Sequence, residues 1–586
     1  MSELRRRVIK GTGICEGIGE GKAFVIRQFK PSFQAESSLS VEEEIHRFKK
    51  ALEKFNDELD DMIKKTRSHS AAGEAEILEA QLILSQDTSL FNKTLEHIKQ
   101  GYSSEYAIDG VCTECIEGFM RSGDRSLIDR TEDIRDIEQR MMVILSEKKQ
   151  PDMKDIPENS ILFCDELGSN LLPLLYSKNL VGVVSQRGSI SGHAAIVVRG
   201  ITIPAVFSAN GILRFVKDGQ NIIVDGRNGL VYINPSSEDE KNSRNLRIWI
   251  DNRRREYEKY RNLPGLTSDG YKFAVLSNIG SDEGLMRAYE NGCEGIGLYR
   301  TEYLFQKKGG EPSEEEQFEI YKKAAIIMKE KDTVIRTIDV GGDKLMPYLM
   351  HPSGMRGTHE RNPFLGLRGI RRSLAFKESF LRQIKAILRA ASYGNVSISI
   401  PMLTTLNELR EAKEIIKEAE AELTKEGKEF KKDVPVGIML ETPSAAILAD
   451  EFAKEVDFFS VGTNDLTQYL MCAERDNPGV EYLYSVFEPA VIRVMYNIIK
   501  TAKKNGIRVG ICGEASHDVN FLAMLVAWGA DGVSVSPAYV TEVRALVAGL
   551  KMEGAEDFFA PVLSMGTRGE IKEFLHRFRE KAFEIA

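Results

Sequence analysis

The sequence predicts an α/β protein, with a closed (β/α)8 TIM barrel in its C-terminal part and a smaller α/β domain, interrupted by a helical bundle, in its N-terminal part. In the C-terminal part, short apolar runs alternate with amphipathic segments of helical length, which is typical of parallel βαβ units. In the N-terminal part, short apolar runs lie on both sides of a long region with helical periodicity. The composition of the 586 residues, 42% hydrophobic and 28% charged, is that of a globular chain.

The N-terminal part opens with short strand-like runs and glycine turns, and its pattern changes at Ser40. Ser40 and Glu43 can form a capping box, and after them apolar residues recur at helical spacing in a charged background. Helices of this length joined by short loops predict a bundle. Pro151 marks the return to short apolar strands. We therefore predict an α/β domain made of residues 1–35 and 146–235, with the bundle of residues 36–145 inserted in it.

A densely charged stretch, residues 236–262, is expected to form a solvated linking helix and to act as the hinge of the molecule. The following residues, 263–586, contain eight apolar runs, the number that closes a (β/α)8 barrel. An open, doubly wound parallel sheet is the structural alternative. The eight predicted strands are 273–279, 295–299, 333–338, 396–402, 434–440, 458–461, 508–512 and 532–535.

The C-terminal ends of the predicted barrel strands carry charged and thiol groups, and the active sites of such barrels lie at those ends. Arginines offer planar donors that suit phosphate or carboxylate, two carboxylates with a substrate phosphate commonly hold Mg²⁺, and a thiol could donate a proton. Each residue alone is more often structural, in a surface ion pair or a buried core. Their number at one rim favours an active site. The candidates are Arg300, Arg336, Arg368 and Arg475 for the anion, Glu441 and Asp465 for Mg²⁺, and Cys512 for the proton.

The N-terminal α/β domain offers one further candidate, His193. Small residues at 188–192 lead into a short apolar helix, and His193 stands near its start. The N-terminus of a helix favours an anion, so a phosphorylated His193 would be stabilised there. The other seven histidines are scattered, and no two of them have the spacing of zinc ligands.

Charge, cysteine usage and hydropathy exclude several classes of protein. The formal net charge of −9 without a basic tract argues against nucleic acid as the main partner. No apolar run approaches the roughly 18 residues that a bilayer span needs, so we expect no association with a membrane. The seven cysteines are scattered and odd in number, and the pair Cys112 and Cys115 is interpreted as structural. A reduced, cytoplasmic protein is the natural expectation.

Six segments resemble enzyme I of the bacterial phosphotransferase system, the phosphoenolpyruvate–protein phosphotransferases. The resemblance covers essentially the whole chain, with the motifs in the expected order. They are the segment around His193 and residues 295–305, 337–344, 362–371, 460–469 and 510–518.

The resemblance implies a role for each candidate residue. It implies that His193 is phosphorylated, that Glu441 and Asp465 bind Mg²⁺, and that Cys512 protonates the enolate. It also implies that a group of residues binds phosphoenolpyruvate through its phosphate and carboxylate. These substrate-binding residues are Arg300, Arg336, Arg368, Asn464, Asp465 and Arg475.

The resemblance further implies a two-step relay in the cytoplasm. The phosphoryl group passes from phosphoenolpyruvate to His193 on a swivelling domain, with release of pyruvate, and then to the phosphocarrier protein HPr. The inserted bundle would dock HPr, and the barrel would form a homodimer. Because no sensory domain precedes the first strands, we expect the sugar branch of the system rather than its nitrogen branch.

The sequence departs from the family pattern at two places. Ser189 and Gly192 replace the glycine and the serine that are usual before the phosphorylated histidine, which bears on the fine tuning of His193. The segment 345–361, near the expected rim, is several residues longer than usual and could alter a lid or a dimer contact.

Three other functions share part of this pattern. Pyruvate,phosphate dikinase and phosphoenolpyruvate synthase use the same chemistry but need an ATP-binding domain, and the chain has no G-x-x-x-x-G-K-[ST] loop. A homologue without catalysis that docks HPr-like partners is the alternative from another class. The intact set of candidate residues at the rim argues against it.

Overall fold

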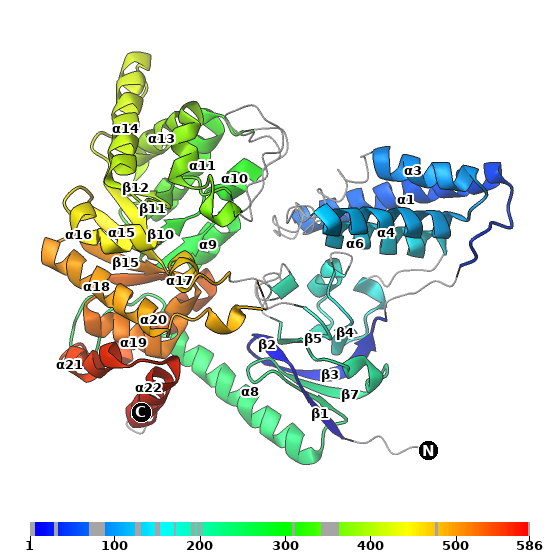
Figure 1. The fold of residues 1–586 in the computed structure, drawn as a ribbon. Coiled ribbons are helices and arrows are strands. Elements are labelled where there is room, and N and C mark those ends of the chain that lie inside the picture. Colours follow the sequence, from blue (N-terminus) through cyan, green and yellow to red (C-terminus); the bar gives the residue numbers. More distant parts are fainter. Residues whose placement is uncertain are drawn as a thin grey trace. The chain divides into compact units, whose positions relative to one another are not determined.

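The computed structural model divides the chain into two compact units, Met1–Arg253 and Arg254–Ala586 (Figure 1). The structure describes residues 6–27, 33–68, 88–122, 131–146, 153–168, 171–188, 194–195, 198, 201, 203–306, 311–341, 362–474, 477 and 479–583.

The first unit is built on an eight-stranded mixed sheet whose strands come from both sides of the helical bundle. Strand β3 lies between β7 and β4, antiparallel to β7 and parallel to β4. The strands at the start of the chain therefore complete a sheet whose other strands follow the bundle, in the order β1-β8-β7-β3-β4-β5-β6-β2. The strands are β1 (Arg7–Lys10), β2 (Thr12–Cys15), β3 (Ile18–Val25), β4 (Ser160–Cys164), β5 (Leu180–Ser185), β6 (Ala205–Phe207), β7 (Asn221–Asp225) and β8 (Leu230–Ile233).

The burial of strand β4 shows that this sheet is covered on both faces. All five of its residues are buried, and successive side chains of a strand point to opposite faces. Ile161 and Phe163 belong to one apolar cluster, with Val206. Leu162 belongs to the cluster on the other face. A continuous apolar run is what a strand buried on both faces requires.

The inserted bundle contains four described helices around a common apolar core. Its first helix begins with the predicted capping box, since the Ser40 N–H donates to Glu43 Oε2 (2.9 Å) and the Glu43 N–H donates to Ser40 Oγ (3.3 Å). Cys112 is completely buried in the core, which agrees with its structural interpretation. The described part of the chain holds no group of three or more histidine, cysteine, aspartate or glutamate side chains that could together hold a metal ion. The helices are α1 (Val41–Ser68), α3 (Thr88–Lys99), α4 (Ser104–Ser122) and α6 (Thr131–Leu145).

The predicted linking helix is present as α8 (Ser237–Glu258). Its first turn is tied to the sheet domain, because Arg6 Nε donates to Asp239 Oδ2 at 2.6 Å. Further along, Ile250 packs against Ile18 and Ile223 of the sheet. The helix is thus anchored to the first unit over most of its length, and its role as a hinge stays a prediction.

The second unit is a closed barrel of eight parallel strands, which confirms the predicted fold and rules out the open sheet. Each predicted apolar run coincides with one strand, with small differences at the ends. The strands are β9 (Ala274–Ile279), β10 (Gly295–Tyr299), β11 (Asp332–Arg336), β12 (Val396–Ile400), β13 (Val436–Leu440), β14 (Phe458–Gly462), β15 (Arg508–Cys512) and β16 (Gly532–Val535).

Amphipathic helices surround this barrel and bury their apolar faces against it (Figure 1). Capping boxes at Ser313 and Glu316 and at Thr405 and Glu408 define where two of them begin. The main helices are α9 (Asp282–Glu290), α10 (Glu302–Gln306), α11 (Glu314–Met328), α12 (Ile370–Ala375), α13 (Lys377–Ala390), α14 (Leu406–Glu426), α15 (Pro443–Ile447), α16 (Ala449–Phe452), α17 (Thr463–Met471), α18 (Pro489–Asn505), α19 (Val519–Trp528), α20 (Val540–Gly549), α21 (Ala555–Phe559) and α22 (Arg568–Phe583).

Among the described residues, every helix is either too short or too polar to cross a lipid bilayer.

Candidate active site

The barrel places most of the predicted site residues at the C-terminal ends of its strands. Arg336 and Cys512 are the last residues of β11 and β15, and Glu441 follows β13 directly. Gly462 at the end of β14 is in register with Cys512, so Asn464 and Asp465, in the first turn of α17, lie at the same rim. Arg300 follows β10, and Arg368 precedes α12. His193 and Arg475, together with Ser189, Gly192 and the segment 345–361, lie outside the described residues.

Arg336 is buried and is held by two carboxylates. Its Nη2 lies 2.8 Å from Glu302 Oε1, and its Nη1 lies 3.3 Å from Asp339 Oδ2. None of the described residues provides a hydrogen-bond acceptor for its Nε. The unused N–H of this buried guanidinium can donate a hydrogen bond to an additional acceptor, such as an oxygen of an anionic substrate.

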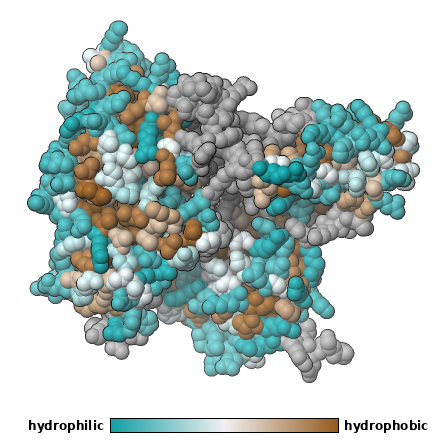
Figure 2. All heavy atoms as spheres, in the orientation of Figure 1, coloured by the Kyte–Doolittle hydropathy of each residue, from teal (hydrophilic) through white to brown (hydrophobic). Residues whose placement is uncertain are grey.

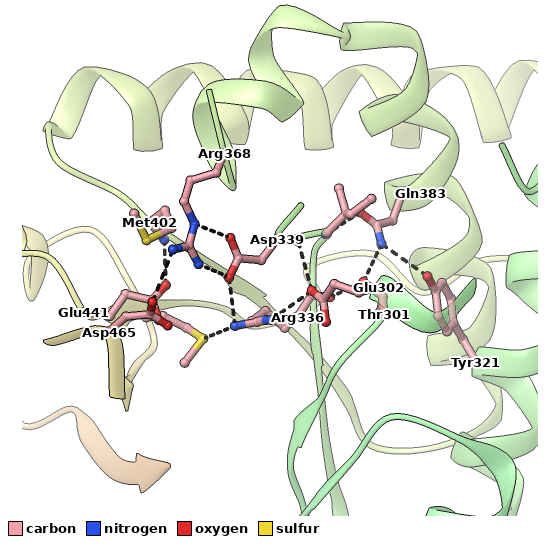
Figure 3. Close-up of polar contacts among 12 residues, drawn as sticks. Thr301, Glu302, Tyr321, Arg336, Asp339, Arg368, Gln383, Met402, Glu441 and Asp465 are labelled. Atoms are coloured by element: carbon pink, nitrogen blue, oxygen red, sulfur yellow. Dashed lines mark hydrogen bonds and ion pairs between the residues drawn. The ribbon is translucent and has the colours of Figure 1, made fainter. Parts of the chain in front are cut away.

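Arg368 is buried beside Arg336 and shares a carboxylate with it. Its guanidinium makes a two-pronged contact with Asp339, at 3.2 and 2.8 Å. Its Nη1 also donates to Asp465 Oδ1 (3.2 Å) and to the hydroxyl of Tyr469 (3.1 Å). Figure 3 shows this guanidinium between Asp339 and the carboxylates of Glu441 and Asp465. Asp339 therefore fixes both arginines relative to each other.

Glu441 is completely buried and only half satisfied. Its Oε1 accepts from the backbone N–H of Met402 (2.8 Å), and its Oε2 has no hydrogen-bond partner in the part of the chain that the structure describes. Burial, together with the nearby carboxylates of Asp465 and Asp339, raises the pKa of Glu441 to about 8. Met402 has a positive φ of 61°, which is uncommon for a residue other than glycine. Met402 thus has a strained backbone conformation at the point where its N–H donates to Glu441.

The space around Glu441 Oε2 is kept open by Gly462. A Cβ at position 462 would lie 2.5 Å from that oxygen, so any larger residue would occupy the position in front of it. No donor among the described residues satisfies this oxygen. It is available to a ligand that can satisfy a buried carboxylate.

Cys512 provides a protonated thiol next to the arginines. Burial raises the pKa of Cys512 to about 12, although the charges of Arg300 and Arg336 oppose this shift. The thiol packs with Leu298 and Met439. Its side chain is therefore an acid that holds its proton at neutral pH and could deliver it to a reacting group.

Sequence reasoning assigned no role to several residues that build the site. Glu302 and Asp339 stand at strand ends, but the sequence does not say which arginine each one binds. Gln383 is a polar residue on the otherwise apolar face of α13, between Phe380 and Ile384. A polar residue at a core position is the signal by which it could have been found.

Comparison with protein families assigns this site to a known group. Residues 254–552 match the PEP-binding domain of PEP-utilising enzymes, residues 156–229 match their mobile domain, and residues 10–130 match their N-terminal domain. The phosphoenolpyruvate-protein phosphotransferase of Priestia megaterium is 36% identical over 568 residues, which cover 97% of this chain and 98% of the relative. This chain belongs to the phosphoenolpyruvate-protein phosphotransferase family.

A second curated relative gives the same result, and the resemblance seen in the sequence is confirmed. The phosphoenolpyruvate-protein phosphotransferase of Bacillus subtilis (strain 168) is 35% identical, covering 97% of this chain and 99% of the relative. A solution structure of an Enzyme I protein is 27% identical, covering 42% of this chain and 99% of that structure, with a TM-score of 0.37. As a phosphoenolpyruvate-protein phosphotransferase family member, the protein is an enzyme.

Proposed function

We propose that the protein transfers the phosphoryl group of phosphoenolpyruvate to His193 and then to HPr, with release of pyruvate, as the first step of the sugar phosphotransferase system. The observation that carries the proposal is the pair of buried arginines joined through Asp339. Arg336 and Arg368 lie beside Glu441 and Asp465 at one rim of the barrel. Guanidinium groups fixed before the substrate arrives can stabilise the charge of a transferring phosphoryl group without reorganisation.

Phosphoenolpyruvate is a dianionic phosphate with a carboxylate, and the proposed site has donors for both groups. Arg336 retains a free donor at Nε, and Arg368 lies next to it. We assign Arg300, Asn464, Asp465 and Arg475 to the same substrate site. For Arg475 and for the acceptor His193, the assignment rests on the sequence resemblance.

The residues present fit a bound Mg²⁺. Glu441 Oε2 is a buried carboxylate oxygen without a partner, and Gly462 leaves the position before it open. Among the described residues of the site, the carboxylates of Glu302, Asp339 and Asp465 already offset the charges of Arg300, Arg336 and Arg368, so an anionic substrate needs another positive charge. Glu441 and Asp465 would hold the ion. When bound, Mg²⁺ supplies positive charge that stabilises the phosphoryl and enolate oxygens.

In the proposed chemical step, His193 accepts the phosphoryl group and Cys512 donates a proton. Neutral His193 attacks phosphorus, a nitrogen–phosphorus bond forms, and the bond from phosphorus to the enol oxygen breaks. Cys512 delivers its proton to the terminal carbon of the enolate, which gives pyruvate. The high pKa of Cys512 keeps this proton on sulfur until the enolate forms.

The remaining assignments concern assembly and location. We assign the bundle to the docking of HPr, the barrel to a homodimer, and the protein to the cytoplasm. Exposed apolar residues on the barrel unit support the dimer, and Figure 2 shows several apolar patches there. Ile447, Tyr482 and Leu365 have exposed fractions of 78%, 66% and 64%, and such residues are typical of an interaction surface when they cluster.

Labelling with phosphoenolpyruvate tests the proposal. The full-length protein is incubated with Mg²⁺ and phosphoenolpyruvate that carries a labelled phosphoryl group. We expect acid-labile, base-stable label on the wild type and on His576→Ala, a control at an exposed histidine of α22, and none on His193→Ala. Absence of label on the wild type, or undiminished label on His193→Ala, would contradict the proposal. Labelling by ATP would favour the dikinase chemistry instead.

A further inference from the structure

Gln383 reaches from a helix outside the barrel to the ends of two barrel strands. Its side chain is completely buried. Its Nε2 donates to Thr301 Oγ1 (3.2 Å), shortly after β10. Its Oε1 accepts from the backbone N–H of Ile338 (3.0 Å), shortly after β11. One amide thus joins two segments that follow neighbouring strands.

The orientation of this amide is fixed by its partners. The backbone N–H of Ile338 can only donate, so the amide oxygen of Gln383 must face it. The two hydrogens on Nε2 then point to Thr301 Oγ1 and to the hydroxyl of Tyr321 (3.2 Å). Tyr321 in turn donates to Gln317 Oε1 (3.2 Å). Figure 3 shows Gln383 between Thr301 and Tyr321.

Both strand ends held by Gln383 carry residues of the active site. Thr301 stands between Arg300 and Glu302 in the sequence, and its hydroxyl donates to the carbonyl of Arg336 (3.0 Å). Ile338 stands two residues after Arg336 and directly before Asp339.

The two strand ends also meet on the substrate side. Glu302 Oε1 accepts from Arg336 Nη2 (2.8 Å) and from the backbone N–H of Asp339 (3.0 Å). The arrangement of the arginines therefore depends on the distance between the two segments that Gln383 spans.

We propose that Gln383 is a positioning residue for phosphoryl transfer: it holds the segments after β10 and β11 so that Arg300, Arg336 and Asp339 present one preformed anion site. This inference rests on the function proposed above. Among the described residues, Gln383 contacts no substrate-binding side chain itself, and it acts through Thr301 and Ile338. An apolar residue of similar size could fill the same volume, so packing alone does not explain an amide at this place.

A matched pair of variants separates positioning from stability. Gln383→Leu removes all three hydrogen bonds, including those to Thr301 and Ile338. Tyr321→Phe removes hydrogen bonds from the same buried cluster but leaves the contacts of Gln383 with both strand ends intact. The unfolding of each full-length variant is followed in urea. The rate of single-turnover labelling by phosphoenolpyruvate and Mg²⁺ is measured in parallel.

We expect Gln383→Leu to label about 10²-fold more slowly than the wild type, because a shift of about 1 Å in a catalytic group has an effect of that size. We expect Tyr321→Phe to lose no more than about threefold while unfolding at a similar urea concentration, because it too gives up buried hydrogen bonds. Equal rates for the two variants would overturn the inference.

Gln383→Glu adds a readout that a merely structural role would not change. A protonated glutamic acid can still accept from Ile338 and donate to Thr301, and burial raises the pKa of such a group by up to about 3–5 units. We expect its rate, divided by that of the wild type, to be highest at pH 6 and to fall towards pH 9. The corresponding ratio for Gln383→Leu should not depend on pH.

The outcomes distinguish this inference from the function on which it rests. An unlabelled wild type would overturn the proposed function and the inference together. A labelled wild type with a pH-independent ratio for Gln383→Glu, or with near-normal labelling of Gln383→Leu, would overturn the inference alone. If Gln383→Leu does not fold, the pH profile of Gln383→Glu still decides.

Discussion

Asp339 offsets the cost of burying two arginine side chains at this site. Two buried guanidinium groups would be costly without partners, and Asp339 is within hydrogen-bond or ion-pair distance of both Arg336 and Arg368. At the same rim, Glu441 keeps one oxygen without a partner. The two guanidinium groups are therefore held in place by ion pairs with Asp339, whereas the Glu441 oxygen without a partner lies where a ligand would bind.

Cys512→Ala tests the assignment of the proton donor. We expect pyruvate formation to fall by about 10²–10⁴-fold, the range in which general acid catalysis contributes, because alanine has no proton to deliver. The variant should still accept a phosphoryl group from phospho-HPr, since this reaction needs no enolate. Pyruvate release and labelling from phospho-HPr are measured separately. Cys472→Ser, at an exposed cysteine, serves as the control, and unchanged pyruvate formation in Cys512→Ala would contradict the role.

Gly462→Ala tests the assignment of Mg²⁺ to Glu441. The added Cβ would lie 2.5 Å from Glu441 Oε2, so we expect Mg²⁺ affinity to fall by about 10- to 100-fold, as for changes around other metal sites. Calorimetric titration with Mg²⁺ measures this without catalysis. Gly510→Ala is the matched control, because a Cβ at that position of β15 meets nothing within 4 Å. Equal affinities in the two variants would refute the assignment.

At the scale of elements, helix α8 is fixed at its beginning by a small polar cluster. Asp239 Oδ2 accepts from the backbone N–H of Ser236 (2.8 Å) and from Arg6 Nε (2.6 Å). Ser236 Oγ accepts from the N–H of Asp239 (3.2 Å). The hydrogen bond with Arg6 is the main cause that holds the pKa of Asp239 well below its usual range. The cluster caps the helix and ties it to the first strand.

Asp239→Asn should loosen the beginning of α8. Loss of a cap costs about 1 kcal/mol, so we expect roughly fivefold faster hydrogen exchange in the first turn of α8, measured by mass spectrometry of the full-length protein. Because the folded-state pKa is lowered, the stabilisation is present at neutral pH and is lost as acid protonates Asp239. The wild type should therefore approach the variant only in acid. Glu238→Gln is the control, and equal exchange in Asp239→Asn and wild type would contradict this reading of the cluster.

At the scale of the whole molecule, the barrel unit exposes several large apolar side chains to solvent. Ile447 and Leu448 are adjacent at the end of α15 and are 78% and 36% exposed. Burying such residues in a second copy would remove apolar surface from water. This supports the homodimer proposed above.

Ile447→Glu should weaken that homodimer. Truncation or charging of a central interface residue commonly costs more than about 1 kcal/mol, so we expect the dissociation constant, measured by sedimentation at several concentrations, to rise at least about fivefold. Met120→Glu, at an apolar residue of the bundle with an exposed fraction of 56%, should leave it unchanged. A monomeric wild type would exclude the dimer, and an unaffected Ile447→Glu would exclude this surface.

The sequence by itself determined the barrel, and it predicted most of the candidate site residues that the structure places at the rim of the barrel. Strand and helix periodicities are local, so the eight apolar runs predicted the eight strands. Their last residues pointed to Arg336, Glu441 and Cys512, because the carboxyl ends of parallel strands meet at one rim. Only the tertiary structure decided how these groups are paired. Gln383 meets Thr301 across 82 residues, and Met402 meets Glu441 across 39. Such contacts depend on the closure of the barrel, which brings distant segments together, and no local pattern encodes them.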